Sequence, residues 1–89
     1  MDKPLFAAEY LLSVIKPLTK LPDLVRVDME TDENRGIMLE VTCDPADLPI
    51  LVGRNGSRAE AFRVIMMGWG RLNAANVYVH VGGKFSIRE

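Results

Sequence analysis

Two helix-start signals lie close together near the middle of this chain, and they constrain its fold more than any other sequence feature. Asp44-Pro45 can cap and open a first helix, because aspartate accepts hydrogen bonds from exposed amides and proline needs none at the first helical position. Ser57-Arg58-Ala59-Glu60 matches the capping box that opens a second helix. Between the two signals, Gly53-Arg54-Asn55-Gly56 predicts a tight turn. The centre of the chain is therefore predicted to be a short helix, a glycine-bracketed loop and a longer helix.

Hydrophobic spacing predicts further elements on both sides of this centre. An apolar helical pattern follows Pro4, and Pro17 should kink or end that helix near Ile15 to Thr19. Alternating apolar and polar residues predict strands over residues 25–30, 37–43 and 77–81. In the longer central helix we expect a buried stripe made of Phe62, Ile65, Met66, Trp69 and Leu72. The predicted order is helix, strand, strand, short helix, longer helix, strand.

The composition is that of one ordinary globular domain over residues 1–89, with 48% apolar and 26% charged residues. A single cysteine, Cys43, excludes an internal disulfide and, with the single histidine, His80, disfavours a structural zinc site. Cys43 is expected to be a small core residue, and His80 to lie on a solvated strand face. No apolar run is long enough to span a membrane and no secretory signal is present, so a reducing, cytoplasmic setting with no membrane partner is predicted.

Charge is distributed unevenly along the chain although the net charge is only −1. Residues 1–52 hold ten acidic and five basic side chains, whereas residues 53–89 hold six basic and two acidic ones. The net charge argues against strong electrostatic binding of nucleic acid, but the positive excess begins at the glycine loop.

The loop has the chemistry of a phosphate contact. Gly53 permits the abrupt turn, Gly56 lets another molecule approach the backbone, and the first amides of the helix opened by Ser57 point toward the loop. Arg54 and Arg58 add positive charge. A plain connection between two helices explains the local pattern equally well, because glycine also ends helices for local reasons. The spacing matches neither the Walker loop nor the GxGxxG dinucleotide turn.

The sequence LVGRNGSRAEAFR over residues 51–63 resembles the signature of a KH domain, in which an apolar pair is followed by GxxG and a helix. The order of elements is similar to the type II KH arrangement (α-β-β-α-α-β). Asp44-Pro45-Ala46-Asp47-Leu48 before the loop and the Pro22-Asp23 turn are similar to the small single-domain bacterial KH proteins of the KhpA type.

This resemblance implies an α+β fold in which a three-stranded mixed sheet has three helices packed on one face. It implies that single-stranded RNA of about four nucleotides lies in a groove and is held at the loop. The backbone contacts would come from Gly53, Arg54, Asn55, Gly56, Ser57 and Arg58. Ile50, Leu51 and Val52 would line an apolar floor under the bases, and the Thr31 to Arg35 turn with the sheet edge would form the opposite wall.

The leading hypothesis is a non-enzymatic single-stranded RNA-binding protein that acts as an RNA chaperone or post-transcriptional regulator, with binding of single-stranded DNA left open. One short groove binds weakly, so a homodimer or a heterodimer with a second KH protein is expected. Replacing Gly53 and Gly56 together with aspartate is predicted to abolish RNA binding and leave the fold largely intact.

A protein-interaction domain that has kept the KH shape is the alternative, because the N-terminal half is acidic and the loop carries modest charge. An enzyme is the least favoured interpretation, since no nucleophile–base pair, catalytic residue, cofactor motif or metal-ligand set is found.

Overall fold

The computed structural model describes residues 2–32 and 36–82, and within them helices and strands form an α+β arrangement, as predicted. The elements are α1 (Lys3–Ile15), β1 (Arg26–Asp32), β2 (Gly36–Thr42), α2 (Leu48–Val52), α3 (Ser57–Leu72) and β3 (Val77–Val81). Short 3₁₀ turns complete the path at η1 (Lys16–Leu18), η2 (Pro22–Leu24) and η3 (Arg54–Gly56).

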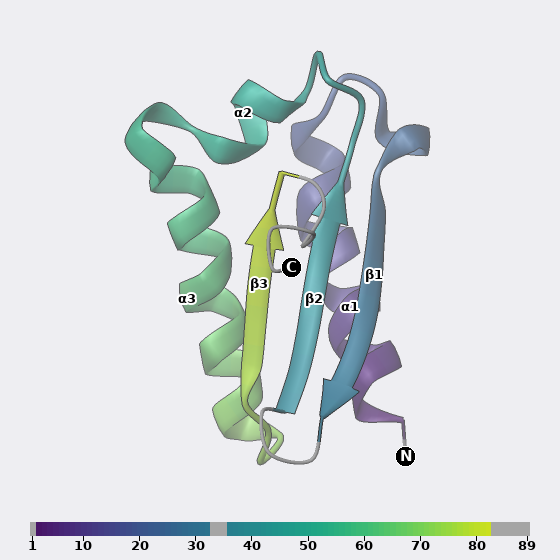
Figure 1. The fold of residues 1–89 in the computed structure, drawn as a ribbon, viewed down its shortest axis with the longest axis vertical. Helices are drawn as coiled ribbons and strands as arrows, with labels where there is room; N and C mark the ends of the chain where they lie inside the picture. Colours follow the sequence, from purple (N-terminus) through teal and green to yellow (C-terminus); the bar gives the residue numbers. More distant parts are fainter. Residues whose placement is uncertain (1, 33–35, 83–89) are drawn as a thin grey trace.

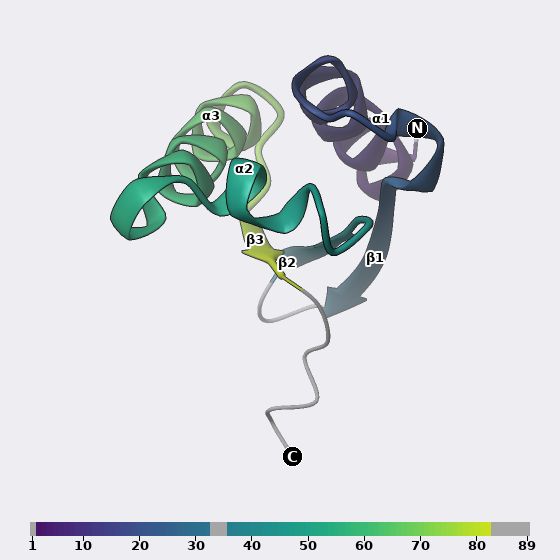
Figure 2. The ribbon, with the colours of Figure 1, turned by 90° about the horizontal axis from the view of Figure 1, so that it is seen from above.

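The three strands form one mixed sheet in the order β1-β2-β3, which confirms the sheet expected from the sequence. β1 and β2 run antiparallel, with Asp28 opposite Glu40, and β2 and β3 run parallel, with Glu40 beside His80. Figure 2 shows α1, α2 and α3 on the same side of the sheet. Figure 1 looks onto the other face, with α1 behind the strands.

The core lies between the sheet and the helices. Its side chains recur at every second position in the strands and at helical spacing in the helices. In the central strand β2, Ile37, Leu39 and Val41 alternate inward and are 5%, 0% and 1% exposed. The helices contribute side chains at helical spacing, and these are Ala7, Ala8, Leu11, Ile15, Leu51, Phe62 and Met66. β1 is an edge strand, so its alternation buries less, and Met29 remains 42% exposed.

Pro17 ends α1 as predicted. The α-helix stops at Ile15 and continues as the 3₁₀ turn Lys16–Leu18, because proline has no N–H to donate to the preceding turn.

The predicted buried stripe of α3 is only partly correct. Phe62 and Met66 are buried and Trp69 packs partly against the core, but Ile65 is 38% and Leu72 88% exposed. The buried face is centred on Ala59, Phe62, Met66 and Gly70. Ile65 and Leu72 were wrongly assigned to the core because they lie on the flank of that face, and apolar spacing alone does not fix where a stripe is centred.

Gly70 allows α3 to approach the segment that leads into β3. A Cβ at position 70 would lie 2.4 Å from the carbonyl oxygen of Ala75, whereas a Cβ at position 68 would meet nothing within 4 Å. Close packing is therefore a property of Gly70 and not of Gly68.

Alanine at these two glycines is predicted to change the free energy of unfolding in opposite directions. Gly68→Ala should raise the free energy of unfolding by about 0.5–1 kcal/mol, because alanine favours an exposed helix position. Gly70→Ala should lower it by about 1–3 kcal/mol, since the added methyl group forces the backbone at Ala75 to shift. Urea denaturation of both variants measures the difference. Equal effects would contradict the close approach at Gly70.

The start of α2 differs from the prediction. The helix begins at Leu48, and Asp44 instead forms a turn in which its Oδ2 accepts from the Ala46 amide at 2.9 Å. Asp47 is the residue with the structural role. It is fully buried, and its two carboxylate oxygens accept from the Lys20 and Leu21 amides at 2.9 Å each.

α3 begins at Ser57 as predicted, but the capping box is not formed. Gly56 occupies the N-cap position in a left-handed conformation, and no side chain caps the helix. Glu60 Oε1 accepts instead from Arg63, which reaches back one turn along the helix. A glycine at the cap cannot supply the side-chain oxygen that the motif needs.

Candidate nucleic-acid interface

The loop between α2 and α3 has a backbone that few residue types can adopt. Gly53, Asn55 and Gly56 have φ angles of 78°, 56° and 77°. Glycine adopts such angles without strain, and asparagine tolerates them better than most residues. These angles let the chain reverse within η3, and they leave the Arg54 and Asn55 side chains exposed at the tip.

The two loop glycines are required for different reasons. A Cβ at Gly53 would lie 2.7 Å from the Arg58 amide nitrogen and 2.8 Å from the Arg58 Cβ, whereas a Cβ at Gly56 would meet nothing within 4 Å. Any side chain at position 53 therefore disturbs the start of α3. The expectation that aspartate at both positions leaves the fold largely intact does not hold for Gly53, and only Gly56 opens outward.

Several amides around the loop are already used inside the chain. The Gly53 amide donates to Pro49, the Gly56 amide to Gly53, and the Ser57 amide to Arg54. The sequence suggested that the first amides of this helix are open to a ligand, but the Ser57 amide is not, because the 3₁₀ turn supplies its acceptor. Positive charge at this end of the molecule comes from the helix dipole of α3 and from exposed arginines.

Arg58 braces the loop from the first turn of α3. Its guanidinium donates through one terminal nitrogen to the Ile50 carbonyl, which ties the start of α3 to α2. The residue is exposed, and a guanidinium has five N–H donors, so this bond uses a fraction of its capacity.

The three apolar residues before the loop do not share one environment. Ile50 and Val52 are partly exposed, but Leu51 is 0% exposed and belongs to the core. Leu51 cannot contact a ligand in this conformation, so its assignment to the binding surface is corrected. An α-helix turns 100° per residue, and three consecutive side chains therefore cannot all point to one side.

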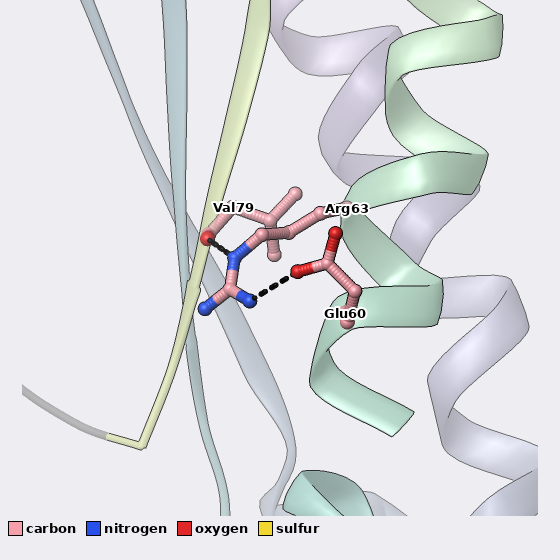
Figure 3. A network of polar contacts seen from close by, with 3 residues as sticks. All are labelled: Glu60, Arg63 and Val79. Carbon is pink, nitrogen blue, oxygen red and sulfur yellow. Dashed lines mark hydrogen bonds and ion pairs between the residues drawn. The ribbon is translucent and has the colours of Figure 1, made fainter. Parts of the chain in front are cut away.

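A groove of about 430 Å³ runs between α3 and β3. One wall is formed by Arg63, Met67 and Arg71 of α3, and the other by residues 75–79. Figure 3 shows Arg63 reaching from α3 to Val79 of β3. Its Nε donates to the Val79 carbonyl at 3.2 Å, and a terminal nitrogen donates to Glu60 Oε1 at 3.0 Å.

The β3 side of the groove is a sheet edge. β3 pairs with β2 on one side only, so the backbone groups of Val79 point away from β2 toward α3. Tyr78, which is 53% exposed, and Met67, which is 52% exposed, add apolar surface to the groove.

Cys43 packs partly against the core, as predicted. Burial, together with the carboxylates of Asp47 and Asp44, raises the pKa of the Cys43 thiol, so the thiol stays protonated at neutral pH. Across residues 2–32 and 36–82, no three histidine, cysteine or acidic side chains converge as a metal site would require. Over the same ranges, no helix has the length and apolar character needed to cross a membrane.

Comparison with known families identifies the arrangement. The family model described as "KhpA/KhpB, KH domain" matches residues 8–81, which include both helices around the loop and all three strands. The chain belongs to this family.

Two relatives within the KhpA/KhpB family share substantial sequence with the chain. The "RNA-binding protein KhpA" of Leifsonia xyli is 39% identical over 59 residues, covering 66% of this chain and 76% of the relative. The protein of the same name from Mycobacterium tuberculosis is 39% identical over 57 residues, covering 64% of this chain and 70% of that one.

Solved structures of Era share the fold of this KH domain. A single-residue variant of Aquifex aeolicus Era bound to GDP.AlF4- superposes with a TM-score of 0.61 at 17% identity, over 91% of this chain and 31% of Era. A structure of Era in complex with MgGDPNP and nucleotides 1506–1542 of 16S ribosomal RNA gives the same TM-score at 18% identity, over 30% of that chain. The KH chain therefore spans less than a third of Era.

The predicted opposite wall of the groove combined a sheet edge with a turn, and only the turn is misplaced. Thr31 and Asp32 pair with Ile37 and Gly36 at the start of β2, while α2 and the loop follow its other end, as Figure 1 shows. Thr31 and Asp32 are thus at the far end of the sheet from the loop. Residues 33–35 of that turn lie outside the described residues.

Sequence reasoning missed the α3–β3 groove. Arg63, Met67 and Arg71 recur every four residues and so lie along one flank of α3, which was a readable signal. The spacing could not predict which element lies beside that flank of α3. β3 lies there because the chain crosses over after β2, and local spacing does not specify that crossover.

Proposed function

We propose that this protein binds single-stranded RNA, with the RNA backbone at the Gly53–Gly56 loop and the bases along the α3–β3 groove. The observation that carries this proposal is the loop itself, which presents Arg54 and Asn55 to solvent and leaves open space at Gly56. The KhpA relatives are named RNA-binding proteins, which supports the same function. The order of elements and the mixed sheet agree with a type II KH domain.

The charge of this surface fits a polyanion. Within the described chain, the arginines that follow residue 52 are Arg54, Arg58, Arg63 and Arg71, and all belong to the loop or to α3. Glu60 is the single acidic residue in that part of the described chain, and Arg63 contacts it. Phosphates that approach α3 therefore meet a positive surface, although the molecule as a whole is slightly acidic.

The groove offers chemistry for bases rather than phosphates. An unpaired strand edge exposes N–H and C=O groups that can pair with base edges, and bases pack on apolar and aromatic surface. Along α3, Arg63 lies about 9 Å from Ser57 and Arg71 about 21 Å, at 1.5 Å per residue. A strand of about four nucleotides anchored at the loop would reach along this groove.

Arg63 provides a specific test of the groove. Arg63→Ala should weaken binding of single-stranded RNA about 3- to 20-fold, because one charge and the donors that face the groove are lost. Arg26→Ala is the matched control, since Arg26 lies on the opposite face of the sheet and its removal changes the net charge equally. Fluorescence anisotropy with a labelled oligonucleotide measures both. Equal losses would indicate a net-charge effect and not a groove contact.

A salt titration separates this proposal from the alternative of a protein-interaction domain. If the loop contacts about three phosphates, the affinity should fall about 20-fold between 50 and 200 mM salt. An absence of binding at low salt, with the protein folded, would favour the alternative. Single-stranded DNA of the same sequence, tested in parallel, measures whether 2′-hydroxyl groups matter.

We further propose that the protein works as a dimer, either with itself or with a second KH protein, in the cytoplasm as an RNA chaperone or post-transcriptional regulator. Exposed apolar side chains on the outer surfaces of α1 and α3, which include Phe6, Tyr10, Val64 and Leu72, support association. Two linked grooves would raise the affinity for one RNA without any new base contact. Sedimentation with and without RNA, and crosslinking to RNA in cells, test these roles.

A further inference from the structure

The face of the sheet that is turned away from the helices carries a concentration of acidic side chains. We call it the open face. Because Ile37, Leu39 and Val41 point into the core, the alternate residues point the other way, toward the viewer in Figure 1. The carboxylates on this face are Asp28, Glu30, Asp32 and Glu40.

The register brings these charges together. Asp28 lies directly opposite Glu40 in the antiparallel pair, an arrangement of like charges that destabilises a sheet. Arg26 contacts Asp28 at 3.9 Å, but the two side chains are 73% and 60% exposed, so their ion pair is weak. The four carboxylates outnumber Arg26, so the described part of the open face is net negative.

Glu40 occupies the centre of this face and has an unusual environment. Its Oε2 atom is shielded from solvent, and no donor in the described part of the chain reaches it. A shielded carboxylate oxygen normally has a hydrogen-bond donor, and a cation is the strongest one. Met38 and Tyr78, which are neighbours across β2 and β3, place apolar surface beside it.

The chain that follows β3 has the complementary composition. Residues 83–89 read GKFSIRE, in which Lys84 and Arg88 flank the apolar Phe85 and Ile87. They follow directly on Val81 and Gly82, at the β3 edge of the sheet. Seven residues reach about 23 Å when extended, whereas the distance from β3 across to β1 is about 10 Å.

We infer that the Lys84–Arg88 segment docks on the open face of its own domain. Its two cations would face the carboxylates of β1 and Glu40, and Phe85 and Ile87 would pack on Met38 and Tyr78. Charge complementarity and the exit point of the chain favour this occupant over a separate partner, because a tethered segment has a high effective concentration at the face. The inference concerns the open face rather than the α3–β3 groove, with Tyr78 at the border of both surfaces, and it does not require RNA binding.

A spin label on the segment tests this directly. Ser86→Cys in a Cys43→Ala background, labelled with a nitroxide, should broaden the amide NMR signals of Met38, Glu40 and Tyr78. The same label at Ala61, which is exposed on α3, should broaden those signals less than the Ser86 label does. High salt should reverse the broadening caused by the Ser86 label, since the Debye length falls to about 3 Å at 1 M.

Two further samples make the result decisive. Glu30→Lys in the labelled protein should reduce the broadening, and adding Lys84→Glu should restore it, whereas Glu9→Lys on the exposed surface of α1 should change nothing. A mixture of isotope-labelled protein without the nitroxide and spin-labelled protein without the isotope should show no broadening. Broadening in that mixture would show that the segment of a second copy binds the open face. Sharp signals in every sample would show that the segment does not bind there and that the face is open to another basic partner. Either result would overturn the inference.

Discussion

Gly56→Asp is expected to bind single-stranded RNA at least about fivefold more weakly than Gly56→Asn. The two side chains have nearly the same shape, and both tolerate the left-handed backbone at this position better than most residues. They differ by one negative charge at the point where the loop is open to an approaching molecule. A carboxylate within about 5 Å of a phosphate opposes binding by about 1–3 kcal/mol, which corresponds to a 5- to 150-fold loss.

The asparagine variant makes this comparison independent of folding. Each substitution should cost about 1 kcal/mol of stability through backbone strain, so both domains remain folded by circular dichroism. Anisotropy titrations at two salt concentrations then compare the affinities, and the difference should shrink at high salt. Equal affinities of the two variants would mean that RNA phosphates do not approach Gly56. Gly53 is unsuitable for such a pair, because any Cβ there meets the start of α3.

The parts of this fold that could be predicted from the sequence depend on local rules. Pro17 ended α1, alternating residues gave the three strands, and two glycines marked a turn before Ser57, because each effect acts over a few neighbouring residues. The same local rules placed Arg54 and Asn55 at an exposed loop tip.

The remaining features depend on contacts between distant segments. Val79 lies beside Arg63 only because β3 joins the sheet in parallel with β2, and no local pattern specifies that pairing. The capping box at Ser57 failed because Gly56 competes for the cap position, and the motif does not account for that neighbour. Leu51 belongs to the apolar run over residues 50–52, and the turn of the helix points these side chains in different directions.

Local sequence rules did not single out Asp47, although it has a structural role. Its replacement is the second change that is expected to have a large effect. Asp47→Ala should lower the free energy of unfolding by about 3 kcal/mol, because a fully buried carboxylate that accepts two backbone hydrogen bonds is removed. The Lys20 and Leu21 amides would then lose their acceptor in a partly buried position. A domain of this size has a stability of only about 5–10 kcal/mol, so the variant should unfold at a much lower urea concentration.

Asp44→Ala is the matched control, since the same side chain is removed three positions earlier. Asp44 accepts one hydrogen bond, from the Ala46 amide at an exposed turn, so its loss should cost no more than about 1 kcal/mol. Asp47→Asn should fall between the two, because the amide keeps one acceptor oxygen but places an NH₂ group against a backbone donor. Equal costs for the two alanine variants would contradict the structural role of Asp47. The expected ranking would establish that the contact between Asp47 and the segment after α1 stabilises the domain.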